Sequence, residues 1–185
     1  MKLRELRTED ASLMLEWMDD DFVVHDLATD FSKKTMEDCI NFIEYAISQT
    51  SDLAVCKNIH MAVTDDNNEY MGTVSLKHIN RQHKNAEFAI TVRRSAMGRG
   101  YSSYAMNEII RFGFETPELD LASIYWCVDK NNLRARRFYD KQNYQIVQAN
   151  EYMMENYKRV GRGENELIWY SVHRSSHQHL IQLRR

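Results

Sequence analysis

The sequence predicts an α/β protein, a single domain with a mixed central sheet and helices on both faces of that sheet. A chain of 185 residues suits one domain, and its 43% hydrophobic residues are enough for a core. Strand-like and helix-like segments follow one another in the order β-α-α-β-β-β-α-β-α-β-β, and short turns join the long central strands. We expect the domain to span residues 1–174 and residues 175–185 to form a C-terminal tail.

The first half of the chain supplies strands, two helices and a hairpin. Charged residues alternate with Leu3 in the first strand, and Thr8 or Asp10 can cap the first helix. In the second helix apolar residues recur every three or four positions, which is typical of one buried face. The expected strands are 2–7, 60–66, 69–79 and 86–92, and the expected helices are 11–20 and 35–49.

The second half begins with a helix at 101–115, which the only proline of the chain, Pro117, ends. A β-rich run and a short amphipathic helix come next, and two strands close the fold. The expected strands are 122–128, 144–150 and 166–172, and the short helix is 132–142.

The composition excludes several classes of protein. A net charge of −3 gives no footprint for nucleic acid or a membrane surface, and no apolar run approaches the length of a membrane helix. The charged N-terminus does not resemble a signal peptide, and three scattered cysteines suit a reducing compartment. We expect a cytoplasmic protein, and the seven histidines show no zinc-like spacing, so we expect no metal.

Two of the six glycines, Gly98 and Gly100, stand one residue apart between a strand and a helix. Glycine lets the backbone approach a ligand closely, and the free amides of a helix start favour an anion such as pyrophosphate. We expect Arg93, Arg94 and Arg99 to add positive charge there. From these residues alone, a plain strand-to-helix connection is about as well supported.

Two well-known phosphate motifs do not fit this turn. A P-loop needs Lys followed by Ser or Thr after its second glycine, but Tyr101 and Ser102 follow Gly100. A dinucleotide fingerprint needs a third glycine where Ser103 stands. Its ribose-binding acid should end the next strand, whereas Asp120 precedes that strand.

The segments 86–114 and 124–144 resemble the core of the GNAT acetyltransferases, most closely the polyamine and ribosomal-protein N-terminal acetyltransferase branch. The family pattern Arg/Gln-x-x-Gly-x-Gly/Ala falls on residues 97–102, and Asn-x-x-Ala-x-x-Leu/Phe-Tyr is met by Asn132, Ala135, Phe138 and Tyr139. Met97 and Ser102 depart from the first pattern, and Asn143 replaces the glycine that follows the second. Asn is the next best residue at a positive φ.

The resemblance implies a GNAT fold with splayed parallel strands, and acetyl-CoA as co-substrate. Backbone amides make most contacts to the pyrophosphate, and the pantetheine arm bonds to the splayed strand like an added strand. The cofactor-binding residues implied are Ile90, Val92, Met97, Gly98, Arg99, Gly100, Tyr101, Ser102 and Asn132.

Two residues are candidate catalysts. By resemblance, Tyr139 protonates the departing CoA thiolate; taken alone, its spacing also suits a core aromatic residue. Acetylation needs a neutral amine, so a base must remove the ammonium proton, and Glu87 is the best candidate. Alternation places Glu87 on the strand face opposite Phe88. A solvated Glu87 paired with a basic neighbour is equally open.

The acceptor is the least determined part. Residues 9–38 carry ten acids and two bases, a local balance of −8 that would attract a polyamine or a peptide N-terminus. The candidate substrate-binding residues are Phe22, Asp26 and Glu87, with Trp17 and Phe31 as a further apolar wall. An amino sugar stays open as the acceptor, and a solvated face stays open as the explanation of the acidic stretch. Whether the chain forms a homodimer also stays open. A loop around Gly161 and Gly163 is expected to cover the acceptor.

The resulting prediction is an acetyl-CoA-dependent N-acetyltransferase that moves the acetyl group to a primary amine of a small molecule or peptide by direct nucleophilic attack. Its main rival is an acyl-CoA-binding regulatory domain without efficient catalysis. A dinucleotide enzyme and a non-catalytic interaction module fit the sequence less well.

Overall fold

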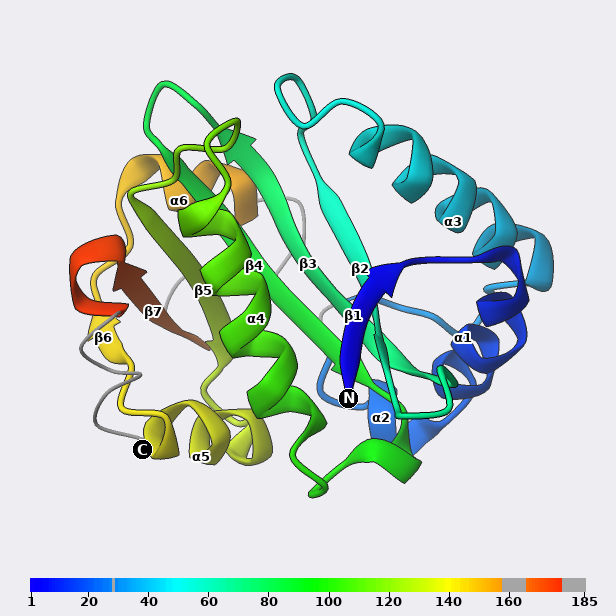
Figure 1. The fold of residues 1–185 in the computed structure, drawn as a ribbon. Coiled ribbons are helices and arrows are strands. Elements are labelled where there is room, and N and C mark those ends of the chain that lie inside the picture. Colours follow the sequence, from blue (N-terminus) through cyan, green and yellow to red (C-terminus); the bar gives the residue numbers. More distant parts are fainter. Residues whose placement is uncertain (28, 158–165, 178–185) are drawn as a thin grey trace.

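The computed structural model describes residues 1–27, 29–157 and 166–177, which form one mixed sheet with helices on both faces (Figure 1). Its strands are β1 (Lys2–Glu5), β2 (Ile59–Thr64), β3 (Tyr70–Asn80), β4 (Asn85–Val92), β5 (Ser123–Asp129), β6 (Gln145–Val147) and β7 (Leu167–His173). Its helices are α1 (Ala11–Met18), α2 (Asp21–Val24), α3 (Met36–Thr50), α4 (Tyr101–Glu115), α5 (Leu133–Lys141) and α6 (Glu151–Tyr157), with 3-10 turns η1 (Thr8–Asp10) and η2 (Arg94–Ala96).

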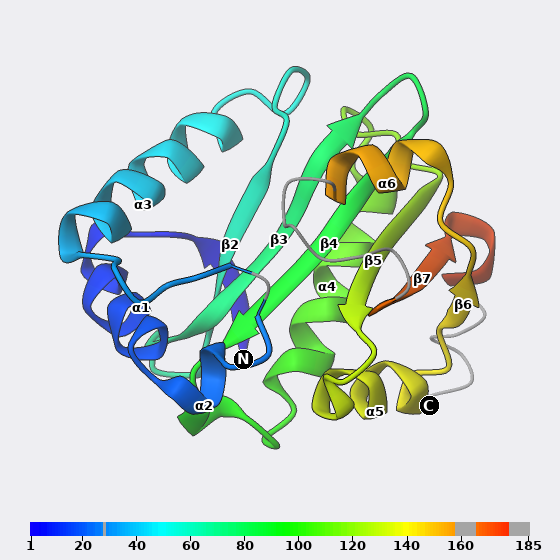
Figure 2. The same cartoon turned by 180° about the vertical axis from the view of Figure 1, so that it is seen from behind.

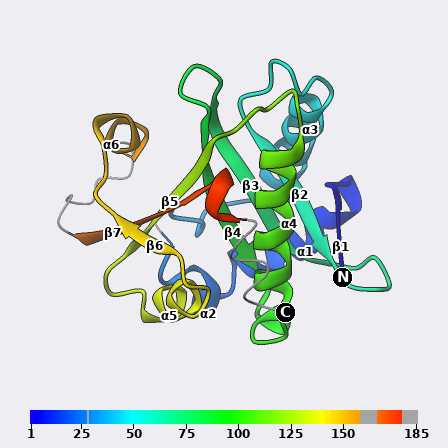
Figure 3. The ribbon, with the colours of Figure 1, turned by 60° about the vertical axis from the view of Figure 1, so that its left-hand side comes forward.

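The strand order is β1-β2-β3-β4-β5-β7-β6, so β6 lies at the outer edge beside β7 (Figure 3). All neighbours are antiparallel except β4 and β5, which are parallel. These two strands pair only over Asn85–Glu87 and Ser123–Tyr125. Beyond that point β4 runs on to Val92 and β5 to Asp129 with no further pairing between them, so the two strands part.

The helices divide between the two faces of the sheet. Helix α4 crosses one face (Figure 1), and α1, α3 and α6 lie on the opposite face (Figure 2). The main core lies under α4, where Ile109 and Ile110 pack with the sheet residues Leu76 and Ile124. A second core joins α1 and α3 to the sheet. None of the described helices has both the length and the apolar character that crossing a membrane requires.

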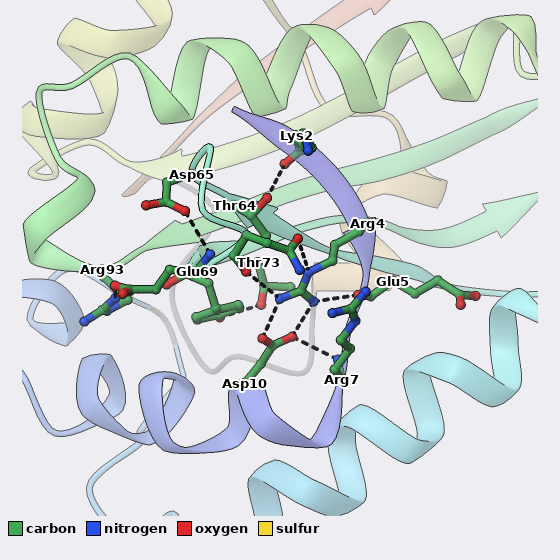
Figure 4. Close-up of polar contacts among 12 residues, drawn as sticks. Lys2, Arg4, Glu5, Arg7, Asp10, Thr64, Asp65, Glu69, Thr73 and Arg93 are labelled. Atoms are coloured by element: carbon green, nitrogen blue, oxygen red, sulfur yellow. Dashed lines mark hydrogen bonds and ion pairs between the residues drawn. The ribbon is translucent and has the colours of Figure 1, made fainter.

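An ion pair fixes the N-terminal strand to the first helix. The Arg4 guanidinium donates to both oxygens of Asp10 at 2.7 Å, and the Arg7 amide donates to the same carboxylate (Figure 4). Asp10 makes no side-chain cap on α1. Asp10, one of the two residues expected to cap the helix, therefore ties β1 to the turn before α1.

The predicted α/β class, with a mixed sheet and helices on both faces, is confirmed. The helix expected at 101–115 begins and ends at those residues. Two of the labelled helices were not predicted: α2, with only four residues, and α6, with seven. The signal for α6 was Asn150, whose side chain accepts from the Met153 amide at the start of the helix.

Candidate active site

A cleft of about 440 Å³ lies where β4 and β5 part. Its walls come from β3, β4, β5 and the start of β7, from α5 and its cap, from the end of α6, and from Asp26, Leu27, Thr29 and Phe31. The wall residues include Glu87 on β4, Cys127 on β5, Asn132 before α5 and Tyr139 within α5. Glu87 and Tyr139, the two predicted catalysts, therefore line one cavity.

Glu87 is held by two basic side chains of β3. The ammonium of Lys77 lies 2.8 Å from Oε1, and Nε2 of His78 lies 3.5 Å from Oε2. The carboxylate is only 16% exposed, but it still faces the cleft. The basic neighbour expected for a solvated Glu87 is present, and so is the access to the cleft that a catalytic base needs.

A strand irregularity explains how two consecutive residues reach the same carboxylate. Side chains at successive strand positions normally point to opposite faces. The register of β3 with β4 shifts between Lys77 and Asn80, and His78 has a φ of 51°. The bulge turns His78 toward Glu87, which is a common use of bulges near functional sites.

Tyr139 lies among aromatic rings but still lines the cleft. It packs against Trp126 and Tyr170, with ring centroids 5.4 and 5.2 Å away. Burial raises the pKa of its phenol, so the hydroxyl keeps its proton at neutral pH. None of the described residues hydrogen-bonds to that hydroxyl. The residue is therefore a core aromatic with a neutral phenol, and it belongs to the lining of the cleft.

Cys127 was not predicted as a site residue. Its side chain lines the same cleft, and burial, followed by the charge of Glu87, raises the pKa of its thiol to about 12. A thiolate therefore gains little solvation in this part of the cleft. No local sequence pattern around Cys127 indicates that it lines the cleft, because its position there depends on where β5 parts from β4.

The glycine turn forms a second cavity of about 320 Å³ beside the cleft. Gly98 and Gly100 have φ values of 73° and 89°, which lie in the left-handed region that favours glycine. Gly100 is the residue before the first turn of α4, so the unpaired amides of that helix start at the turn. Met97, Gly98 and Ser102 line this cavity.

Other predicted cofactor residues line the same cavity. Ile90 and Val92 come from the unpaired part of β4, and Asn132 comes from the opposite wall. Oδ1 of Asn132 accepts from the Ala135 amide and caps α5, which leaves the Nδ2 group as a donor. Asn143, expected to replace a glycine, has a φ of 58°. Arg99, Gly100 and Tyr101 belong to the turn but do not line this cavity.

Arg93 points away from the glycine turn. Its guanidinium donates to both oxygens of Glu16 at 3.0 and 2.9 Å and to Glu69 at 2.7 Å, and the residue is 8% exposed. The expectation that Arg93 adds charge at the turn is therefore wrong, because two carboxylates neutralise it. Arg94 lies over the ring of Phe22, and Arg99 lies over the ring of Tyr101.

The predicted substrate-binding residues are not all together. Asp26 and Glu87 both line the cleft. The carboxylate of Asp26 also lies 3.6 Å from the guanidinium of Arg134. Phe22 is 50% exposed between the guanidinium groups of Arg94 and Arg134, and it does not line the cleft. Its role as an acceptor contact stays a prediction that this placement does not support.

Many of the acids in residues 9–38 are already paired. Arginine or lysine side chains lie within 4 Å of five of the ten: Asp10, Glu16, Asp20, Asp26 and Asp38. The local field is therefore weaker than the residue count indicates.

Three further expectations concern the surroundings. Asp120 pairs with Lys84 and Arg174, at 2.6 and 3.1 Å, before β5 begins, which does not suit a ribose-binding acid. Within the described ranges, no group of three or more His, Cys, Asp or Glu side chains could hold a metal ion. The loop around Gly161 and Gly163 lies outside the described residues.

Comparison with solved structures supports the fold. A spermidine N-acetyltransferase from Vibrio cholerae, solved with CoA and spermine, matches with a TM-score of 0.72 at 16% identity, over 96% of this chain and 97% of that one. A GNAT-family acetyltransferase from Bacillus anthracis matches at 0.68 and 18%, over 92% and 93%. The microcin C7 self-immunity acetyltransferase, solved with acetyl-CoA and AMP, matches at 0.73 and 13%, over 92% and 91%.

No curated protein matches this chain in sequence. The model of the acetyltransferase (GNAT) domain, however, matches residues 1–145, which is more than half of the chain. That match covers the glycine turn, the parted strands and the helix that carries Tyr139. The chain therefore belongs to the GNAT family and is an acetyltransferase.

Proposed function

We propose that this protein is an acetyl-CoA-dependent N-acetyltransferase, which moves the acetyl group to a primary amine by direct attack. The observation that carries the proposal is one cleft, at the parting of β4 and β5, that presents a carboxylate and a neutral phenol. It adjoins the glycine-turn cavity, since Ile90, Asn132 and Tyr139 line both.

The glycine turn and the parted strand would hold the co-substrate. The amides after Gly98 and Gly100 suit pyrophosphate oxygens, because a helix start offers unpaired donors. The backbone of Ile90–Val92 does not pair with the described residues of β5, so it can bond to the amides of pantetheine. Asn132 can add its side-chain amide. The bound acetyl-CoA supplies the activated acetyl group.

Glu87 is the proposed base. Its carboxylate removes one proton from the acceptor ammonium, and the neutral nitrogen then forms the C–N bond as the C–S bond of the thioester breaks. Lys77 and His78 hold the carboxylate in place for this step. The nitrogen loses its second proton as the amide forms, and Glu87 releases the first proton to solvent, which restores its carboxylate.

Tyr139 is the proposed acid. The departing thiolate takes the phenolic proton, and the second proton lost by the nitrogen restores the phenol through solvent. Cys127 indicates why this transfer is feasible, because burial in the same cleft raises the pKa of its thiol to about 12. A CoA thiolate formed there is also poorly solvated and more basic than in water, which offsets the raised pKa of the Tyr139 phenol.

A regulatory acyl-CoA-binding domain is the second candidate function. The ion pair between Glu87 and Lys77 favours it, since a carboxylate held by an ammonium can serve structure alone. Both functions predict CoA binding, but only the enzyme releases CoA when an amine is supplied.

Two measurements separate these cases. Thermal unfolding with acetyl-CoA, CoA, NAD and ATP should show stabilisation by the two CoA species only, and no shift with acetyl-CoA would contradict both functions. Thiol release from acetyl-CoA, measured with a panel of primary amines, should exceed the rate without amine. Stabilisation by acetyl-CoA without amine-dependent release would support the regulatory domain.

A further inference from the structure

A third cavity, of about 250 Å³, lies between α1, α3 and the sheet. Three residues of α1 (Met14, Trp17 and Met18), together with Phe31, Phe42 and His60, supply most of its side-chain wall. Trp17 and Phe31 pack edge to face with ring centroids 5.1 Å apart, and Phe42 packs in the same way against His60 at 4.9 Å. We call this the ring-lined cavity.

The ring-lined cavity continues from the catalytic cleft. Ala89, Ile90, Thr91 and Phe31 line both of them. Ala89 and Thr91 follow Glu87 at two-residue intervals along β4, so all three point to the same face of the sheet. A molecule whose nitrogen reaches Glu87 can therefore extend along β4 into this cavity.

Several polar groups of the ring-lined cavity are already engaged. Nε1 of Trp17 donates to the Tyr70 hydroxyl at 3.1 Å, and Nδ1 of His60 lies 2.7 Å from Oγ of Ser75. Burial lowers the pKa of His60 to about 4, so its ring is neutral at pH 7. These walls offer little to a second ammonium group.

The charged side chains of this lining, Lys34 and Asp38, belong to the rim. They lie 3.7 Å from each other and are each more than 40% exposed. Their charges are opposite and cancel. A polyamine that extends from Glu87 into the ring-lined cavity would place its other ammonium groups against apolar walls, which is costly without a paired counter-charge.

We propose that the acceptor is a primary amine that carries one apolar, ring-sized substituent, and that the ring-lined cavity binds this substituent. The proposal rests on the proposed N-acetyltransferase function and names its substrate class. An apolar cavity of about 150 Å³ is enough to hold benzene. The larger ring-lined cavity accommodates one ring with its linking methylene groups.

The test compares amines that differ in the substituent. Thiol release from acetyl-CoA is measured with 2-phenylethylamine, putrescine, spermidine and glucosamine. We expect kcat/KM for 2-phenylethylamine to exceed that for each of the others by about tenfold or more. A preference for spermidine, putrescine or glucosamine would overturn the inference and leave the proposed function intact.

Binding is read separately from turnover, by amide chemical shifts in NMR. Addition of 2-phenylethylamine should shift the amides of Ser75 and Thr91, and putrescine should shift them less. If 2-phenylethylamine leaves both amides unchanged, the inference fails even where acetyl transfer to another amine is observed. If it shifts them but no amine is acetylated, the cavity is supported and the proposed catalysis is contradicted.

A matched pair of variants on α3 locates the preference. Phe42→Asp places a carboxylate in the ring-lined cavity and should reduce the preference for 2-phenylethylamine over putrescine at least tenfold. Ile47→Asp, at an exposed side chain on the same helix outside the lining, should keep it. Phe42→Ala adds no charge but enlarges the ring-lined cavity, so it should favour a naphthyl-substituted amine. This variant tests the same assignment if Phe42→Asp does not fold. Equal preferences in all three variants would contradict the assignment.

Discussion

The ammonium of Lys77 lies 2.8 Å from the carboxylate of Glu87, inside the cleft where β4 and β5 part. The pair both positions the proposed base and occupies one of its oxygens. His78 approaches the other carboxylate oxygen of Glu87, so this carboxylate has one orientation before any acceptor arrives.

Substitution of the proposed base should mainly affect turnover. Glu87→Gln keeps the shape but cannot accept a proton, and we expect kcat/KM for the amine to fall about 10²- to 10⁴-fold. The binding of acetyl-CoA should change little. Lys77→Met, the control, leaves the carboxylate in place and should retain at least about a tenth of the activity. A Glu87→Gln variant as active as the wild type would exclude the role.

The proposed acid is tested by removing one oxygen atom. Tyr139→Phe should lower kcat by about tenfold or more, with the Kd for acetyl-CoA unchanged, since the ring packing against Trp126 is kept. Tyr170→Phe is the matched control, because Tyr170 belongs to the same ring cluster, binds Asp140 and does not line the cleft. Equal losses in the two variants would indicate a structural effect alone.

The glycine turn should bind through its backbone. Gly98→Ala meets no atom within 4 Å, so its cost is the strain of a positive φ, about 1 kcal/mol. The displaced amides should weaken CoA binding about tenfold, as measured by calorimetry. Arg99→Ala keeps the backbone and removes only a charge, so its effect should be smaller and should vanish at high salt. A larger effect of Arg99→Ala would reverse the assignment.

Arg93 should matter for stability and not for CoA. Arg93→Met leaves Glu16 and Glu69 without their shared partner, and because both acids are half-exposed we expect a loss of about 2 kcal/mol in the free energy of unfolding. Urea unfolding measures this loss. The Kd for CoA of the folded variant should match the wild type, and a large change in it would place Arg93 at the phosphates after all.

His60 should make stability depend on pH. Its pKa is about 4 when folded, because of burial, and about 6.5 when unfolded, so the unfolded chain binds the proton first as the pH falls. The contribution of His60 to the free energy of unfolding is therefore fully present above pH 6.5. It falls by about 3 kcal/mol in total as the pH drops from 6.5 to 4. His60→Gln should flatten this part of the curve of unfolding free energy against pH. An unchanged slope would mean that other groups cause it.

The sequence predicted the elements that carry strong local signals. Gly98, Gly100 and the periodic helix after them define the turn at 97–101 without any knowledge of the fold. Asn132 and Tyr139 are seven residues apart at α5, and both reach the cleft. Local chemistry was sufficient here, because each of these features depends on nearby residues.

Long-range contacts were not visible in the sequence. Arg93 follows a strand that leads to the glycine turn, but its partner Glu16 is 77 residues away. The ring-lined cavity combines α1, α3 and three strands, and only Trp17 and Phe31 were expected near an acceptor. The bulge at His78 likewise depends on the pairing of β3 with β4.

The pairing of β4 with β5, which spans only three residues of each strand, also divides the sheet mechanically. Strands β1–β4 form one hydrogen-bonded half and β5–β7 form the other, so few backbone bonds resist their separation. Cofactor amides that bond to the open edge of β4 would add bonds at this joint. The proposed binding of acetyl-CoA would therefore strengthen the sheet at a joint that only three residue pairs hold together.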